Sequence, residues 1–390
     1  MRCDLKSWCA LRVFPIQDYR SRVGHNALNV AGDVVSLTRD LVNFPSVSRN
    51  EAELADALEE ILRQQPWLEV TRINNSLVAR TSLGRSQRVI VAGHIDTVPV
   101  ADNDSAVMVS AGNALPTGET VNEDVLFGLG SCDMKGGVAV ALRAAVTLSE
   151  PVFDVTYIFY ECEEIDSTLN GLTLIAAARP DLLAADIAVL LEPSNAGIEA
   201  GCQGTLVAQV EVAGVRAHSA RSWKGTNAIH GLSHLLETLN VYEPQRITID
   251  GLEYREGLNA VQIHGGVANN VIPDSVVVNV NYRYAPNKTA QEAEAHVRAV
   301  LGGFAVTIID NIAGAMPGLD RPALADLVAR SNGQVAPKFG WTDVARFYAL
   351  GVPAVNMGPG DPSLAHARNE HVPVSQLHSC ESTVLSWLRG

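Results

Sequence analysis

A chain of 390 residues is longer than one hydrophobic core usually supports, so we expect two domains. Hydrophobic residues make up 47% and charged residues 18% of the sequence, which is typical of a globular enzyme. No apolar run is long enough to predict a membrane span, and a net charge of -14 without a basic stripe argues against a nucleic-acid partner.

The N-terminal segment, residues 1–28, differs in character from the rest of the chain. Basic residues alternate with Cys3, Trp8 and Cys9, and no unbroken apolar core or small-residue cleavage site of a secretory signal is present. We therefore expect a disordered extension there. The six cysteines contain no CxxC pair, which predicts reduced thiols in a cytoplasmic protein.

From residue 33 to residue 203, helical and strand patterns alternate. Apolar residues at helical spacing predict three helices, and short apolar runs predict three strands. The expected helices cover 33–44, 51–64 and 136–148, and the expected strands cover 88–92, 155–160 and 187–191. This alternation is typical of an α/β domain with a mostly parallel central sheet and helices on both of its faces.

Near residue 204 the pattern changes to alternating strands, which predicts a compact α+β unit. Its expected strands cover 206–212, 246–249, 261–267, 276–284 and 304–309, and its expected helices cover 227–239 and 289–300. After residue 314 the α/β pattern resumes, with helices at 323–330 and 343–350, a strand at 354–357 and a closing helix. We therefore expect a catalytic domain of residues 29–203 and 314–390, interrupted by an inserted domain of residues 204–313.

Five candidate metal ligands indicate the function of the chain. Four of them follow short apolar runs or a glycine-rich turn, where a parallel sheet delivers side chains to a crevice, and the fifth is a late histidine. Two histidines and three carboxylates suit two closely spaced divalent cations that activate a water molecule. The candidates are His94 in GHIDT, Asp133 in CDMKGG, Glu164 in CEEID, Glu192 in LLEPS and His366 in AHARNE.

Two further carboxylates have expected roles beside these ligands. Asp96 lies two residues after His94, where it can accept a hydrogen bond from the far ring nitrogen and fix the tautomer. Glu163 adjoins Glu164 but points in another direction, so it can act as the general base. Taken alone, each motif has a plain alternative, and for Asp133 this alternative is a helix N-cap.

The late histidine has competitors of its own. In HARNE, Glu370 follows His366 by four residues, and if the segment were helical it would lie on the same face as a supporting partner of His366. His371 is the main rival as a metal ligand, and His378 is a weaker one. The ordered set of five ligands is harder to explain by chance than any single member.

In this order and local context, the residues resemble the co-catalytic dizinc amidohydrolase superfamily, which includes aminoacylases, acetylornithine deacetylases and succinyl-diaminopimelate desuccinylases. The resemblance runs from about residue 33 to the C-terminus and is most detailed with the actinobacterial type of desuccinylase. The segments that carry it are FGLGSCDMKGGVAV, EAGCQGTL, RAHSARSW, YREGLNAVQI, NVIPD, KFGWTDVARF and GPGDPSLAH. It implies a ferredoxin-like inserted domain that serves as a lid and as the dimerisation surface of a homodimer.

The resemblance also implies a role for each candidate. One zinc ion would be held by His94 and Glu192, the other by Glu164 and His366, with Asp133 shared between them and Co²⁺ as a possible substitute metal. Asp96 would orient His94, and Glu163 would take a proton from the attacking water and pass it to the leaving amine. The oxyanion would be stabilised in part by His218, in RAHSAR, supplied from the partner subunit. Asn270 and Arg283 match substrate-contact positions, and Arg221 and Arg346 are weaker candidates.

The implied activity is hydrolysis of N-succinyl-LL-2,6-diaminopimelate to succinate and LL-diaminopimelate. Two departures from better-known desuccinylases weaken the assignment of the acyl group: GCQG replaces a more basic segment before the inserted domain, and GWTDVARF replaces the TSDGRF form. Acetylornithine deacetylase or a dipeptidase is therefore the alternative within the superfamily. A catalytically inactive binding relative is a further alternative, although every metal ligand is retained.

Overall fold

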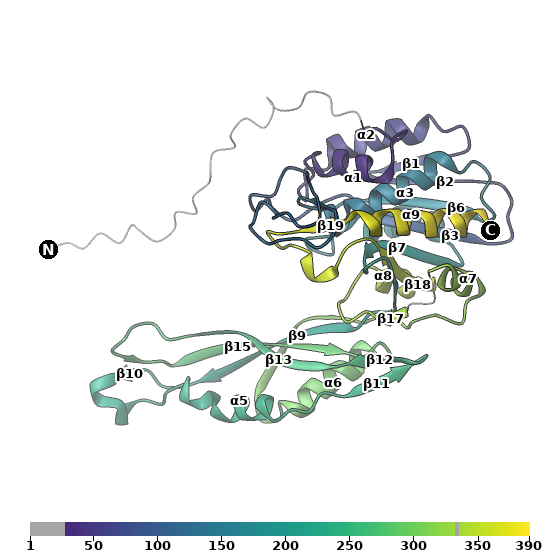
Figure 1. The fold of residues 1–390 in the computed structure, drawn as a ribbon. Helices are drawn as coiled ribbons and strands as arrows, with labels where there is room; N and C mark the ends of the chain where they lie inside the picture. Colours follow the sequence, from purple (N-terminus) through teal and green to yellow (C-terminus); the bar gives the residue numbers. More distant parts are fainter. Residues whose placement is uncertain (1–27, 332–334) are drawn as a thin grey trace.

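The computed structural model describes residues 28–331 and 335–390, and its centre is an eight-stranded sheet (Figure 1). The strand order is β1-β2-β6-β3-β7-β18-β8-β17. Neighbouring strands from β6 to β18 run parallel, whereas β1 and β2 on one side and β8 on the other join antiparallel partners. The bounds of the eight strands are Glu69–Ile73 (β1), Ser76–Arg80 (β2), Asp154–Tyr160 (β6), Arg88–His94 (β3), Ile187–Pro193 (β7), Ala354–Gly358 (β18), Ile198–Ala200 (β8) and Val335–Pro337 (β17).

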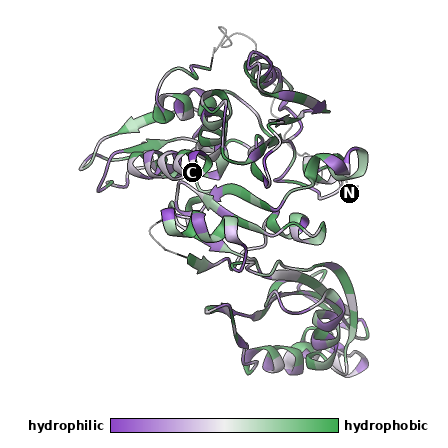
Figure 2. Ribbon diagram, turned by 90° about the vertical axis from the view of Figure 1, so that its right-hand side faces the viewer, coloured by the Kyte–Doolittle hydropathy of each residue, from purple (hydrophilic) through white to green (hydrophobic). Residues whose placement is uncertain are grey.

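Helices cover both faces of this sheet, so its central strands are buried on both sides. In β3, Val89 and Val91 point into one hydrophobic cluster, while Ile90 and Ala92 point into the other. Figure 2 shows that the strands at the centre of the sheet are largely hydrophobic. The larger cluster is completed by α1 (Val34–Val42), α2 (Ala52–Arg63), α3 (Gly136–Thr147), α7 (Pro322–Arg330) and α9 (Val374–Arg389), and the smaller by α4 (Gly171–Ala178) and α8 (Val344–Ala349).

A second, four-stranded antiparallel sheet is inserted between β8 and β17. The chain leaves the first sheet at Cys202 and returns at Ala315, where these two residues exchange backbone hydrogen bonds of 3.0 Å. Two helices pack on one face of the inserted sheet, and Figure 1 shows them on the side away from the eight-stranded sheet. The strand order is β13 (Gly257–Gly265), β15 (Ser275–Tyr284), β9 (Gly204–Ala213) and β16 (Ala305–Ile312), and the helices are α5 (Ser233–Asn240) and α6 (Ala290–Val300).

Short elements complete the two sheets. In the three-stranded sheet β19-β5-β4, a strand from the C-terminal part of the chain pairs with two strands from the N-terminal part. Two further two-stranded ribbons, β10-β14 and β11-β12, belong to the inserted segment. Their bounds are Val107–Val109 (β4), Val125–Phe127 (β5), His371–Pro373 (β19), Ala217–His218 (β10), Val271–Ile272 (β14), Arg246–Ile249 (β11) and Leu252–Arg255 (β12). The short helical turns are Ser131–Lys135 (η2), Pro180–Leu183 (η3), Ser219–Lys224 (η4), His230–Leu232 (η5) and Pro362–Leu364 (η6).

The structure confirms the expected α/β class, corrects the start of one expected helix and decides one alternative that the sequence left open. The helix predicted over 227–239 begins only at Ser233, because the Asn227 side chain accepts hydrogen bonds from the backbone N–H groups of Ile229 and His230 and holds an Asx turn. The segment from His366 to Glu370 is not helical, since His366 has a φ of 63° and lies in a turn.

The N-terminal extension predicted over residues 1–28 lies almost wholly outside the described residues. Only Leu28 belongs to the described part, where it is buried in the larger core cluster. Among the described helices, we find none with the length and apolar character needed to cross a lipid bilayer.

Candidate metal centre

Three neighbouring strands of the central sheet bring the candidate ligands to one edge. His94 is the last residue of β3, Glu192 is the sixth residue of β7, and Glu164 follows the end of β6. Asp133 comes from η2, in the turn that leads into α3, where its φ of −118° and ψ of 95° are not helical. Because β3, β6 and β7 are parallel, their carboxyl ends meet, as expected for a site in an open α/β sheet.

Asp133 stands between the two histidines. Its Oδ1 lies 3.0 Å from His94 Nε2, and its Oδ2 lies 3.4 Å from His366 Nε2. Glu192 Oε1 is 3.9 Å from His94 Nε2, and Glu164 Oε2 is 2.8 Å from His366 Nε2. The five side chains therefore form two halves, one of His94 and Glu192 and one of His366 and Glu164, with Asp133 shared between them.

The electrostatics of this group fit a cation site. Burial, together with the charge of Asp133, raises the pKa of Glu192 to about 8. Hydrogen bonds to Asp133 and Glu164 raise the pKa of His366 to about 10. Burial acts to lower the pKa of His94, but its hydrogen bonds to Asp133 and Asp96 outweigh burial and raise it. Three carboxylates gathered in a partly buried space need positive charge beside them, and two divalent ions would supply it in place of the protons on the histidines.

Asp96 connects the ligands to the loop that carries Glu163 and Glu164. Its carboxylate accepts hydrogen bonds from the backbone N–H groups of Glu163 (3.0 Å) and Glu164 (3.2 Å) and from the Ser48 hydroxyl (2.7 Å). His94 Nδ1 lies 3.1 Å from the Asp96 carbonyl oxygen and 3.4 Å from its Oδ1. One fully buried carboxylate thus orients both the imidazole and the loop.

Glu163 precedes Glu164 in the loop after β6, and within the described residues the ion pairs of His94 and His366 involve other carboxylates. Burial and the negative charges of Asp343, Glu192 and Glu164 raise the pKa of Glu163 well above the usual range of a carboxyl, although His94 opposes this effect. A carboxyl with a high proton affinity beside a cation site is suited to accept a proton from water and to release it later.

Two buried acids hold the site in place, and the sequence indicated only one of them as a supporting residue. Glu370 Oε1 accepts the backbone N–H groups of Cys132 and Asp133, both at 3.0 Å, so it fixes the turn that presents Asp133. Glu51 Oε1 accepts the backbone N–H of Cys162 at 3.2 Å and so ties the start of α2 to the loop that follows β6. The sequence indicates Glu370 as a supporting partner of His366, whereas the structure shows it bound to the turn at Asp133. No local pattern indicates Glu51.

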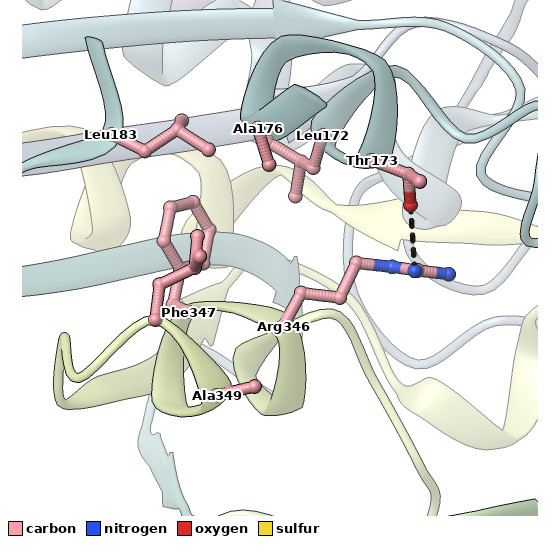
Figure 3. Close-up of a pocket in the computed structure, with 8 residues that line it drawn as sticks. Leu172, Thr173, Ala176, Leu183, Arg346, Phe347 and Ala349 are labelled. Carbon is pink, nitrogen blue, oxygen red and sulfur yellow. Dashed lines mark hydrogen bonds between the residues drawn. The ribbon is translucent and has the colours of Figure 1, made fainter. Parts of the chain in front are cut away.

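His371, Arg346 and Arg221, the other candidate residues, are not part of the group of five ligands. His371 belongs to β19, and its Nδ1 lies 2.7 Å from the Asn369 carbonyl oxygen. Arg346 reaches from α8 to the Thr173 hydroxyl of α4 at 2.8 Å and also bonds Asp343, at the edge of an apolar pocket (Figure 3). Its guanidinium is thus engaged within the fold, whereas Arg221 is exposed in η4.

Three predicted functional residues of the inserted domain are not brought to the metal centre within one chain. His218 is exposed on β10, and its Nδ1 accepts a hydrogen bond from its own turn, from Ala220 N at 3.0 Å. Asn270 is exposed, and its carbonyl oxygen accepts a hydrogen bond from Ser219 N at 2.9 Å. Arg283 is half-buried on β15, opposite Gly257 of β13. Figure 1 shows β10 at the end of the inserted sheet, well away from the eight-stranded sheet.

The described cysteines take no part in the centre. Cys132, Cys162, Cys202 and Cys380 are buried and form no disulfide with one another. Burial raises the pKa of the Cys202 thiol to about 11 and that of Cys162 to about 12, which keeps both protonated at neutral pH.

Comparison with known families and proteins agrees with this geometry. A model of the family described as peptidase family M20/M25/M40 matches residues 90–389. A succinyl-diaminopimelate desuccinylase of Corynebacterium glutamicum is 45% identical over 372 residues, which cover 93% of this chain and 97% of that relative. A protein of Mycobacterium tuberculosis, whose name as the desuccinylase DapE is provisional, is 50% identical over 366 residues, covering 93% of this chain and 100% of its own.

Solved structures with low sequence identity show the same fold. A tripeptidase from Staphylococcus aureus superposes with a TM-score of 0.72 at 20% identity, covering 93% of this chain and 98% of that one. A dinuclear metal-binding peptidase of the M20 family from Bacillus subtilis superposes with a TM-score of 0.63 at 16% identity, covering 91% and 96%. These two solved structures therefore share the fold of this chain.

Proposed function

The chain belongs to peptidase family M20/M25/M40, and from this membership we propose that it removes the succinyl group of N-succinyl-LL-2,6-diaminopimelate, releasing succinate and LL-diaminopimelate. It is a metal-dependent hydrolase of a linear amide bond. The observation that carries the substrate assignment is the 45% identity to the Corynebacterium glutamicum desuccinylase over nearly the whole of both chains. A reaction of this kind supplies diaminopimelate and lysine, and the free buried thiols suit an enzyme of the cytoplasm.

The ligand roles belong to the same proposal. One divalent ion would be held by His94 and Glu192, the other by His366 and Glu164, and Asp133 would serve both. Zinc is the metal we expect, because histidine and carboxylate donors suit it, and cobalt would substitute. When bound, the two ions supply Lewis acidity, which polarises the amide carbonyl and acidifies water.

The residues of the chain then perform the proton transfers. Glu163 accepts a proton from the attacking water and delivers it to the nitrogen of the departing diaminopimelate, since one acid/base group serves both steps. Asp96 keeps His94 in a single tautomer and keeps Glu163 in place through its backbone N–H. The raised pKa of Glu163 favours holding that proton between the two steps.

We further propose a homodimer formed by the inserted domain, residues 204–313, in which His218 acts on the partner's metal centre. Its exposure, and its position away from the metal centre of its own chain, support this arrangement. There it would donate a hydrogen bond to the oxyanion of the tetrahedral intermediate. Asn270 and Arg283 would contact substrate carboxylates, for which a guanidinium is well suited because it can engage both oxygens.

Replacing Glu163 by alanine tests the mechanism. We expect turnover to be lost while two metal ions per chain remain bound, because Glu163 is not among the ligands. Elemental analysis and a desuccinylation assay measure the two properties separately. Asp166→Ala, an exposed acid in the same loop, is the control and should retain activity. Normal turnover by the Glu163→Ala protein would refute the mechanism.

A further inference from the structure

A second group of potential metal ligands adjoins the proposed dinuclear centre in sequence but shares no residue with it. Glu51 is the N-cap residue of α2, and Glu161 and Cys162 directly follow β6. One donor atom from each residue, two carboxylate oxygens and one sulfur in all, lies within 4.8 Å of the other two. The three residues are buried, with exposed fractions of 0%, 7% and 5%. One ion could therefore contact all three after small movements of their side chains.

The Glu51 carboxylate has one oxygen that the fold leaves without a partner. Its Oε1 accepts the backbone N–H of Cys162 at 3.2 Å and lies 3.4 Å from the sulfur of the same residue. Its Oε2 is buried and has no hydrogen-bond partner among the described residues. A buried carboxylate of this kind is costly unless a donor or a positive charge meets it.

The basic residues nearest in sequence do not supply that positive charge. Arg72 pairs with Glu59 of α2 at 2.9 Å, and Arg49 is exposed. Within residues 28–331 and 335–390, no lysine, arginine or histidine forms an ion pair with Glu51 or Glu161. Two buried carboxylates beside a thiol, without a positive side chain, are suited to a divalent cation.

The hydrogen bonds of this group do not require its chemistry. Glu51 accepts a single backbone N–H, and Glu161 Oε1 accepts the backbone N–H of Asn75 at 3.1 Å. Glutamine in either place would accept the same bond with its amide oxygen and would avoid a buried charge. Cys162 has a φ of 56°, a conformation that glycine adopts more easily, so its side chain is kept at a conformational cost. Metal coordination explains these three side chains better than hydrogen bonding does.

We propose that Glu51, Glu161 and Cys162 bind a third divalent cation, separate from the two of the proposed centre, with zinc as the preferred ion. Thiolate and carboxylate donors suit zinc, and burial of all three donors keeps substrate away, so the ion is structural. Its binding releases the thiol proton of Cys162, because the thiolate is the form that coordinates metal. The ion fastens the start of α2 to the loop that leads to Glu163 and Glu164.

Cobalt substitution tests this site by a signal that the proposed dinuclear centre does not give. A thiolate bound to Co²⁺ produces an intense charge-transfer band in the near ultraviolet, and the five ligands of the centre include no cysteine. We expect the Co²⁺-loaded full chain to show this band, Cys162→Ser to lose it and Glu51→Gln to lose more than half of it. Cys380→Ser, which alters a buried cysteine of the larger core cluster, is the control and should keep the band. The absence of the band from the unaltered protein, or its survival in Cys162→Ser, would overturn the proposal.

Metal counting on the zinc-loaded proteins gives a second readout. Elemental analysis should find one ion fewer per chain in Cys162→Ser and in Glu51→Gln than in the unaltered protein and in Cys380→Ser. Glu51→Gln keeps an oxygen for the backbone N–H of Cys162, so loss of that hydrogen bond does not explain a lower count. Equal counts in all four proteins would refute the third site. Both readouts are independent of the substrate: a chain inactive on the succinyl compound that shows the band and the lower counts would reject the substrate assignment and leave this site standing.

Discussion

At the scale of single residues, Asp96 is the residue that links His94 to the loop of Glu163 and Glu164. Asparagine at this position keeps the shape, but its amide nitrogen cannot accept a hydrogen bond, so one of the two bonds from the backbone N–H groups of Glu163 and Glu164 is lost. We expect Asp96→Asn to weaken metal binding by about 10–100-fold and to lower the free energy of unfolding by about 1–3 kcal/mol. Competition with a chelator measures the first effect and denaturant unfolding the second. Ser48→Ala, which removes only one donor to Asp96, should have the smaller effect, and equal losses would contradict the account.

The histidines predict that metal binding depends on pH. Hydrogen bonds to Asp133 and Glu164 raise the pKa of His366 to about 10, so in the metal-free protein these contacts exist below that pH and are lost above it. A metal ion must displace the proton, and metal affinity should therefore fall as the pH falls. Calorimetric titration in two buffers with different ionisation enthalpies should reveal proton release. His366→Ala should release fewer protons, and a heat independent of the buffer would refute this expectation.

The sequence predicted the residues that follow a strand end, together with the supporting acid Asp96, but not the contacts that Glu370 and Glu51 make. His94, Glu164 and Glu192 follow or end apolar runs, so their convergence could be expected from the parallel sheet. Glu370 contacts the turn at Asp133 across more than two hundred positions in the chain, and no local pattern reports such a contact. Lys135 is buried and donates to the Phe44 carbonyl oxygen at 2.6 Å, a contact across 91 positions that no local pattern indicates.

At the scale of elements, β13 is the candidate dimer edge. It is an outer strand of the inserted sheet, and Val261 and Ile263 are 57% and 54% exposed. An open edge with exposed apolar residues favours pairing with a second chain. We expect the double change Val261→Lys and Ile263→Lys to produce monomers with little activity, as measured by light scattering and assay. Ile309→Lys on β16, the other outer strand, is the matched control because Ile309 is 56% exposed. Dissociation caused by the β16 change alone would show that the dimer interface lies at β16 and not at β13.

Long elements could be predicted from sequence because their hydrophobic period repeats several times, as in α2 and β15. The two-residue strands β10 and β14 show no period, since each exists only through pairing with the other. The late start of α5 has a similar cause: a single side chain, Asn227, forms a turn that competes with the helix.

At the scale of the whole molecule, we expect each active site to be built from two chains. A protein with Glu163→Ala and a protein with His218→Ala should each be inactive as homodimers. Mixing them under conditions that allow subunit exchange should restore part of the activity, because one site of the mixed dimer has both residues intact. An activity that remains absent after exchange, with mixed dimers demonstrated by mass spectrometry, would place His218 outside the partner's site.

Amide hydrolysis by the zinc-loaded protein is the measurement that tests the proposed reaction. N-succinyl-LL-2,6-diaminopimelate and N-acetylornithine are offered in parallel, each with a chelator-treated control. We predict hydrolysis that prefers the succinyl substrate and stops when the metal is removed. Preference for acetylornithine would keep the metal mechanism and contradict the substrate, and activity that persists without metal would contradict the account as a whole.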